Sequence, residues 1–342
     1  MATELTLDAA LRDADHELPE IRNRAIRNLA PALLERLNER PPVGWIRSAH
    51  PSRAAVVETL VRACADKAPQ NAGLAILGLA QLGAPMAREH AQLGLAREGD
   101  DEASMFVREC SVIALSLLGR AARIEGDASG LLDSIAADLR ALLDDPRDDV
   151  RFQVGPALVE TLDAAAEPEL LAALARETHA EIRENLIASL ALIDPPSPIA
   201  CDKLAELLAG DEGKGPIGWE IARALTAARR PEGGPRLLEA LQVRALRDDA
   251  LEALAVLGPA APAEAGEAIG KLMRGWLVPV FTQVRAAYAM ARIRPSEGEA
   301  RLAELARSVR GQVREAVGEA RANLAKLASE DQRRSGSAYR RE

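Results

Sequence analysis

The residues that could bind a metal ion or move a proton are few and scattered along this chain of 342 residues. No HExxH motif and no His-x-x-x-His spacing occurs. A metal centre needs three or four converging ligands, usually imidazole, thiolate or carboxylate groups. We therefore predict no metal site and no cofactor. The four histidines, which lie far apart in the sequence, are His16, His50, His90 and His179.

Motifs for nucleophilic catalysis and phosphate binding are also absent from the sequence. There is no GxSxG and no GxxxxGK[ST]. Residues 213–216 (Gly-Lys-Gly-Pro) are predicted to form a turn, because no strand precedes them and no Ser or Thr follows the lysine. The carboxylate pairs at 144–145 and 148–149 lie at predicted helix boundaries, where capping is their ordinary role. We therefore expect a protein that is not an enzyme.

The rare aromatic residues, 2% of the chain, are the better candidates for function, since Trp, Tyr and Arg are enriched at interface hot spots. Trp45 lies in a Pro-containing insertion near 38–50 and is the best candidate among the aromatic residues for an exposed position, since loops lie on the surface. Trp219 follows a Gly-Pro turn. Trp276 and Tyr288 lie close together in sequence. These four residues are our candidate partner-binding residues. We expect three phenylalanines to fill the core instead, namely Phe106, Phe152 and Phe281.

The elements that position these residues are predicted to be helices. Hydrophobic residues make up 48% of the chain and charged residues 28%, and the apolar part is rich in Ala and Leu, which favour helix. The net charge of −9 works against general attraction to nucleic acid or anionic membranes, although a local basic patch remains possible. Residues 68–87 lack charge, but their strongly apolar part is too short to span a bilayer.

The cysteines and the N-terminal sequence point to a reducing compartment. Cys64, Cys110 and Cys201 lie far apart and form no CxxC, so we expect free thiols rather than disulfides. No apolar h-region occurs near the start of the sequence. We therefore expect a cytoplasmic protein with no membrane interaction.

A self-similar pattern recurs along the chain at a period of mostly 31–36 residues. Its marker is an aliphatic residue followed by arginine, and in the first four copies a leucine follows seven residues after the arginine. Alignment on this marker, and helix pairing and spacing alone in the units that lack it, predict second helices that begin near 18, 69, 101, 146, 179, 215, 247, 280 and 311. Each is preceded by a first helix. The arginines of the six copies are Arg22, Arg108, Arg151, Arg183, Arg285 and Arg314.

The pattern Asp-x-x-Val-Arg-x-x-(small)-x-x-x-Leu resembles the HEAT repeat, in particular the short bacterial PBS-lyase HEAT-like repeat. The clearest copies are at 148–151 and 180–183. The resemblance implies an all-α fold, a right-handed α-α superhelical solenoid of about nine HEAT-like helix pairs, with the second helices on its concave side. We expect one such solenoid over 1–328 and a flexible C-terminal tail over 329–342.

Stacking also suggests a structural role for the repeat arginines. A planar guanidinium can bind turn carbonyls or carboxylates of the adjacent repeat and so hold the layers in register. The alternative is a basic ladder along the concave face, which would bind nucleic acid.

The expected function is that of a non-enzymatic protein-binding or scaffold module. It would hold a protein or peptide, for which a basic segment is a plausible partner, on the concave face or at the N-terminal insertion. One alternative is a lyase or modification-enzyme subunit related to the chromophore lyases that carry this repeat. A less favoured alternative is nucleic-acid binding, because HEAT-like DNA glycosylases need a basic, aromatic-lined face. HEAT-like deoxyhypusine hydroxylase binds iron through several His-Glu pairs, whereas this sequence has one, His16-Glu17.

Overall fold

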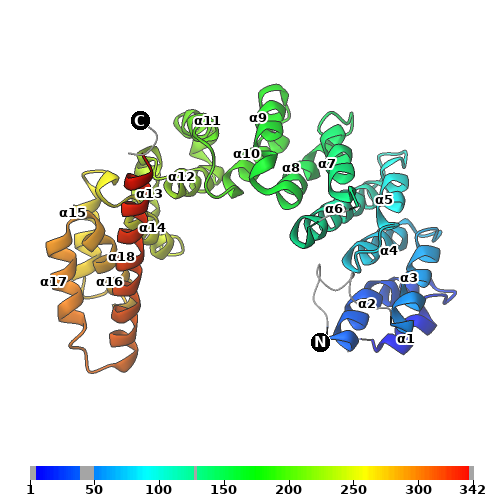
Figure 1. The fold of residues 1–342 in the computed structure, drawn as a ribbon, viewed down its shortest axis with the longest axis horizontal. Coiled ribbons are helices and arrows are strands. Elements are labelled where there is room, and N and C mark those ends of the chain that lie inside the picture. Colours follow the sequence, from blue (N-terminus) through cyan, green and yellow to red (C-terminus); the bar gives the residue numbers. More distant parts are fainter. Residues whose placement is uncertain (1–4, 39–49, 127–128, 339–342) are drawn as a thin grey trace. The chain divides into compact units, whose positions relative to one another are not determined.

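The computed structural model describes residues 5–38, 50–126 and 129–338, and these residues form an all-α fold (Figure 1). Pro at the first helical position starts several helices, because its fixed φ suits a helix and its missing N–H is not needed there. The described residues contain no β-strand. The α-helices are α1 (Leu7–Asp13), α2 (Pro19–Leu37), α3 (Pro51–Ala63), α4 (Pro69–Gln81), α5 (Ala87–Leu95), α6 (Glu102–Glu125), α7 (Leu131–Leu142), α8 (Asp148–Leu162), α9 (Glu167–Arg176), α10 (Ala180–Leu192), α11 (Pro198–Ala209), α12 (Ile217–Ala227), α13 (Gly234–Ala240), α14 (Arg247–Leu257), α15 (Ala265–Arg274), α16 (Val280–Ile293), α17 (Pro295–Leu305) and α18 (Gly311–Ala338).

The even-numbered helices begin where the repeat pattern predicts second helices. Each predicted start lies within two residues of the first residue of α2, α4, α6, α8, α10, α12, α14, α16 or α18. Odd-numbered helices occupy the segments predicted as first helices. The repeat period predicts the helix starts because each helix buries one apolar face against its neighbours, and these helices follow one another at a regular spacing.

The chain divides into two compact units, residues 1–190 and residues 191–342. In the first unit, α2, α4, α6 and α8 pack in succession, and α1, α3, α5 and α7 each pack against the even-numbered helix that follows. In the second unit, α12, α14, α16 and α18 follow the same order. The predicted single domain over 1–328 stays a prediction.

Small residues let the even-numbered helices approach closely in the first unit. A Cβ atom built on Gly119 of α6 would lie 2.4 Å from Thr161 Cγ2 of α8. One built on Gly155 of α8 would lie 2.8 Å from Ser189 Oγ of α10. Such contacts leave no space for a larger side chain, so these glycines set the distance between successive layers.

The even-numbered helices of the second unit run parallel to one another. Thr282 Oγ1, in the first turn of α16, donates a hydrogen bond of 3.1 Å to Asp248 Oδ1, in the first turn of α14. At the other end, Arg292 Nε of α16 donates one of 3.1 Å to the carbonyl of Ala255 in α14. The turns that precede α14 and α16 therefore lie at the same end of the unit.

The last helix continues further than the sequence suggests. A flexible tail is expected from residue 329, whereas α18 continues to Ala338. Asp331 accepts from Arg292 Nη2 at 2.7 Å and pairs with Arg229 Nη2 at 3.1 Å. These ion pairs hold the distal part of α18 against the C-terminal ends of α12 and α16. Within the described ranges, no helix is both long and apolar enough to cross a membrane.

Candidate functional site

A groove of about 800 Å³ lies between α14, α16 and α18 in the second unit. Every residue that lines it belongs to one of these three second helices. Because Ala316 and Ala320 have short side chains, α18 leaves open space beside α16. The other apolar and aromatic lining residues are Val256, Phe281, Val284 and Tyr288.

Acidic side chains give the groove its charge. Glu315 and Glu319 are exposed on α18 and have no cationic partner in the described part of the chain. Arg285, the one arginine of the lining, lies 2.6 Å from Asp248 and 3.6 Å from Glu252. Its charge is therefore compensated within α14, and the groove presents a net negative surface.

Tyr288 lies half-buried in this groove and packs against the core of the second unit. Burial raises the pKa of Tyr288, so its hydroxyl stays protonated near neutral pH. Within the described residues this hydroxyl forms no hydrogen bond with the protein. It can therefore donate to or accept from a ligand that enters the groove.

The repeat arginines of the first unit bind two kinds of partner. Arg22 donates to the carbonyls of His16 and Glu17 in the preceding turn, and to Asp66 from the turn before α4. Arg108 repeats this arrangement with the carbonyls of Arg97 and Gly99. Its carboxylate partner is Asp149 of α8, at 2.7 Å. Each arginine thus closes its own inter-helix turn and ties it to the next helix pair.

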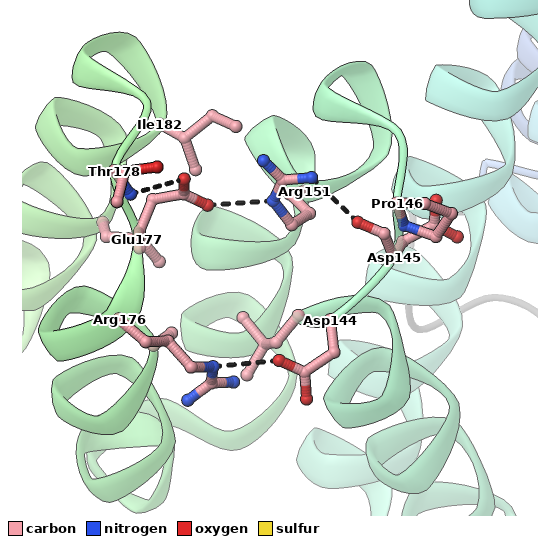
Figure 2. Close-up of a pocket in the computed structure, with 11 residues that line it drawn as sticks. Asp144, Asp145, Pro146, Arg151, Arg176, Glu177, Thr178 and Ile182 are labelled. Atoms are coloured by element: carbon pink, nitrogen blue, oxygen red, sulfur yellow. Dashed lines mark hydrogen bonds and ion pairs between the residues drawn. The ribbon is translucent and has the colours of Figure 1, made fainter.

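Arg151 shows the same geometry in Figure 2, in a cavity of about 390 Å³. Its Nη1 donates to the carbonyl of Asp145 at 2.9 Å, and its Nε donates to Glu177 Oε2 at 2.9 Å. Arg176 and Asp144 form a separate and more exposed pair at 2.9 Å. Because Arg151 binds both the carbonyl of Asp145 and the carboxylate of Glu177, these polar groups are engaged in stacking.

Two carboxylates that pair with the repeat arginines have strongly lowered pKa values. The hydrogen bonds from Arg22 lower the pKa of Asp66 to about 2, and the Ala68 amide and Asn71 assist. Burial raises the pKa of Glu177, but hydrogen bonds from Arg151 and the amides of His179 and Thr178 outweigh it and bring that pKa to about 2. Both side chains are therefore ionised across the physiological range.

The remaining repeat arginines differ in their contacts. Arg183 donates to the carbonyls of Leu174 and Glu177. Arg314 donates to those of Ser308 and Val309. Arg285 instead pairs with Asp248 of the preceding second helix. The turn carbonyls before α16, at Gly275 and Val278, accept from Gln283 Nε2.

The structure separates the four candidate partner-binding residues. Tyr288 lies in the groove, and Trp219 is partly buried against the core of the second unit. Trp276 is 88% exposed in the turn between α15 and α16. Trp45 lies outside the described residues.

Two of the three phenylalanines expected in the core are not there. Phe152 and Phe281 are 38% and 43% exposed, so this expectation is wrong for both. They lie near the N-terminal ends of α8 and α16. The buried positions of these helices are taken by aliphatic side chains such as Val154 and Val284. Phe106 is partly buried and contacts the position of Gly73.

Sequence reasoning missed the α18 side of the groove and one stacking residue. Glu315, Ala316 and Glu319 fit an ordinary amphipathic helix, and no sequence signal marks them as groove residues. Arg147 binds Asp145 and reaches back to the carbonyl of Leu95, at 2.7 Å. The position of Arg147 in an Asp-Pro-Arg turn is the sequence signal that could have indicated this stacking role.

Within 5–38, 50–126 and 129–338, no three His, Cys, Asp or Glu side chains lie close enough together to hold a metal ion. The thiols of Cys64 and Cys110 are also unreactive. Burial raises the pKa of Cys64 and of Cys110 to about 12, and the charge of Glu109 adds to the second shift. Both are therefore poor nucleophiles at neutral pH.

Comparison with known proteins yields a likeness of fold. No protein-family model matches the chain, and no curated protein does. Among solved structures, the X-ray structure of YibA from Escherichia coli is similar with a TM-score of 0.56 and 14% sequence identity. The similarity covers 85% of this chain and 93% of YibA. At this identity, the two proteins share a fold, and the likeness carries no assignment of activity.

Proposed function

We propose that the protein is a non-enzymatic, HEAT-like helical-repeat module that binds a basic, partly apolar segment of a partner protein in the groove between α14, α16 and α18. The single observation that carries the proposal is the composition of this groove. It combines apolar and aromatic side chains with Glu315 and Glu319, which have no cationic partner among the described residues.

The finer architecture belongs to the same proposal. The helix pairs would be about nine HEAT-like repeats of a right-handed α-α solenoid. The support is the succession of even-numbered helices within each unit and the arginines that tie neighbouring pairs together, as Arg22 does with Asp66. Repeat stacking of this kind exposes a long row of second helices to partners.

The chemistry of the groove selects its occupant. Val284, Phe281 and Ala316 would bury the aliphatic side chains of the segment. Glu315 and Glu319 would pair with its lysines or arginines, and Tyr288 can hydrogen-bond its backbone or a polar side chain. Acidic segments are disfavoured by the same carboxylates.

The test is selection from a displayed library of random peptides against the full chain. We expect the selected peptides to combine Lys or Arg with aliphatic or aromatic residues. Binding of a selected peptide should fall at least about tenfold in Phe281→Ala, and similarly in the double variant Glu315→Gln with Glu319→Gln. Glu184→Gln, at an exposed position of α10, is the matched control and should bind normally.

Two results would contradict the proposal. One is selection of peptides without basic residues. The other is binding that the groove variants leave unchanged. Tyr288→Phe separates the roles of this residue, because it keeps the ring and removes the hydroxyl.

A further inference from the structure

The turns that precede α14, α16 and α18 expose apolar side chains. Val243, Trp276, Leu277 and Val309 are 49%, 88%, 76% and 95% exposed. A single exposed apolar residue is ordinary. However, Val243, Trp276 and Val309 follow one another at intervals of 33 residues, which matches the repeat period. They therefore occupy equivalent places in three successive helix pairs.

These turns lie at one end of the second unit. The hydrogen bond between Thr282 and Asp248 joins the first turns of α16 and α14. Phe281 and Gln312, from the first turns of α16 and α18, line the same groove. With neighbouring helices about 10 Å apart, the three turns form one continuous border. We call residues 241–247, 274–280 and 306–314 the turn edge.

The turn edge is strongly basic. Arg244, Arg274, Arg307 and Arg310 are exposed, and their side chains form no hydrogen bond or ion pair with the described part of the chain. Arg247 and Arg314 add two more charges, and they bind backbone carbonyls only.

Few carboxylates lie near these arginines. Those adjacent to the turn edge are Asp248, which is paired with Arg285, Asp249, and Glu315, which directly follows Arg314 and lines the groove. The turn edge therefore concentrates uncompensated positive charge on a chain whose net charge is −9.

Stacking does not account for this composition. In the first unit the corresponding turns carry Asp66, Asp145 and Glu177, and each of these carboxylates forms an ion pair with an arginine. The turn edge has arginines and exposed apolar side chains in place of these ion pairs. A surface that is both apolar and cationic indicates a partner that is both apolar and anionic.

We propose that the turn edge binds the surface of an anionic phospholipid bilayer. Trp276 and Leu277 would enter the interface, and the arginines would contact lipid phosphates. Tryptophan favours this interface because its ring is apolar and its N–H is polar. Basic side chains add attraction to anionic headgroups.

The shape of the turn edge favours lipid over a protein partner. Val243, Trp276, Leu277 and Val309 protrude from turns, and none of them lines the groove. A fluid interface accepts protruding side chains without a complementary pocket. The exposed apolar side chains and the arginines of the turn edge lie outside the groove lining, and the two surfaces adjoin at Gln312. This inference does not rest on the proposed peptide binding.

The experiment measures binding of the full chain to vesicles of phosphatidylcholine with and without phosphatidylglycerol. A variant with Trp45→Phe and Trp219→Phe keeps Trp276 as the only tryptophan. We expect its emission to shift to the blue with the anionic vesicles. Co-sedimentation with these vesicles should be at least about tenfold stronger than with neutral ones, and weaker at high salt.

Paired variants separate the apolar from the electrostatic contribution. Trp276→Ala with Leu277→Ala should reduce vesicle binding at least about tenfold, whereas Ile199→Ala, at a position 72% exposed on α11, should not. Arg244→Gln with Arg310→Gln should reduce binding to anionic vesicles, whereas Lys326→Gln on α18 should not.

Three results would overturn the proposal. The first is no binding to anionic vesicles at low salt. The second is binding that the turn-edge variants leave unchanged. The third is binding of soluble polyglutamate, through the same arginines, without binding of vesicles, which would assign the turn edge to an acidic protein segment.

Discussion

Arg22 and Asp66 form a two-point ion pair across successive helix pairs, with Nε 2.6 Å from Oδ2 and Nη2 2.8 Å from Oδ1. The Asp66 side chain is 6% exposed, so water does little to weaken the pair. The same carboxylate accepts from the Ala68 amide and from Asn71. One aspartate thus links α2, the turn before α4 and α4 itself.

Acid should destabilise the fold through Asp66 and Glu177. Their pKa values are about 2 in the folded chain and ordinarily 3.8 and 4.5. Because the folded values are lowered, this stability is complete above pH 4.5 and is lost as the pH falls towards 2. Each carboxylate should contribute roughly 2–3 kcal/mol to the free energy of unfolding. Urea unfolding at a series of pH values measures the loss, and Asp66→Asn should flatten that profile.

Removal of Arg151 should lower stability more than removal of a surface arginine. Arg151→Ala leaves Glu177, which is 9% exposed, without its cation, at an expected cost of about 2 kcal/mol. Arg176→Ala breaks an exposed pair with Asp144 and should cost less than about 1 kcal/mol. Urea unfolding at neutral pH compares the two variants. Equal costs would argue against the stacking role of Arg151.

Arg108 should be the most sensitive of the repeat arginines. Its side chain is 1% exposed, and its Nη2 has no hydrogen-bond partner in the described chain. Arg108→Ala removes the cation that faces Asp149 and leaves a cavity, so we expect a loss of about 3–5 kcal/mol. Arg108→Lys should recover little, because lysine cannot reach both the turn carbonyls and the carboxylate. Thermal unfolding followed by circular dichroism tests the order of the two variants.

Two glycines should respond oppositely to alanine. Gly119→Ala would place a Cβ 2.4 Å from Thr161 and force α6 and α8 apart, at a cost of about 1–3 kcal/mol. Gly318→Ala on α18 meets nothing within 4 Å and should gain up to about 1 kcal/mol from helix propensity. Denaturant unfolding measures the sign of the change in the free energy of unfolding for both variants. The added change Thr161→Ala should restore part of the loss from Gly119→Ala, and its failure to do so would show that another contact sets the spacing.

The thiols Cys64 and Cys110 should resist alkylation in the folded protein. With pKa values of about 12, they carry almost no thiolate at pH 8 or below. Iodoacetamide labelling followed by mass spectrometry should modify them only in urea. Fast labelling of Cys110 without denaturant would show that α6 opens locally.

The sequence by itself determined where the helices lie. The aliphatic-arginine marker locates α8 and α10, because its aliphatic residue, Val150 or Ile182, is buried where each helix packs. Pro and Gly then mark the ends of the helices, as Pro69 and Gly83 do around α4. These signals lie within or next to each helix, so they can be recognised without knowledge of the helices that pack against it.

Only the tertiary structure decided which carboxylate each arginine binds and which surfaces stay open. Arg22 and Asp66 are 44 residues apart in sequence, and Arg285 takes its partner from the preceding helix pair rather than the next. Phe281 lies in a groove instead of the core, because α18 brings Ala316 and Ala320 rather than larger side chains to face α16. Such outcomes depend on the side chains that a neighbouring helix supplies, and helical periodicity carries no information about those side chains.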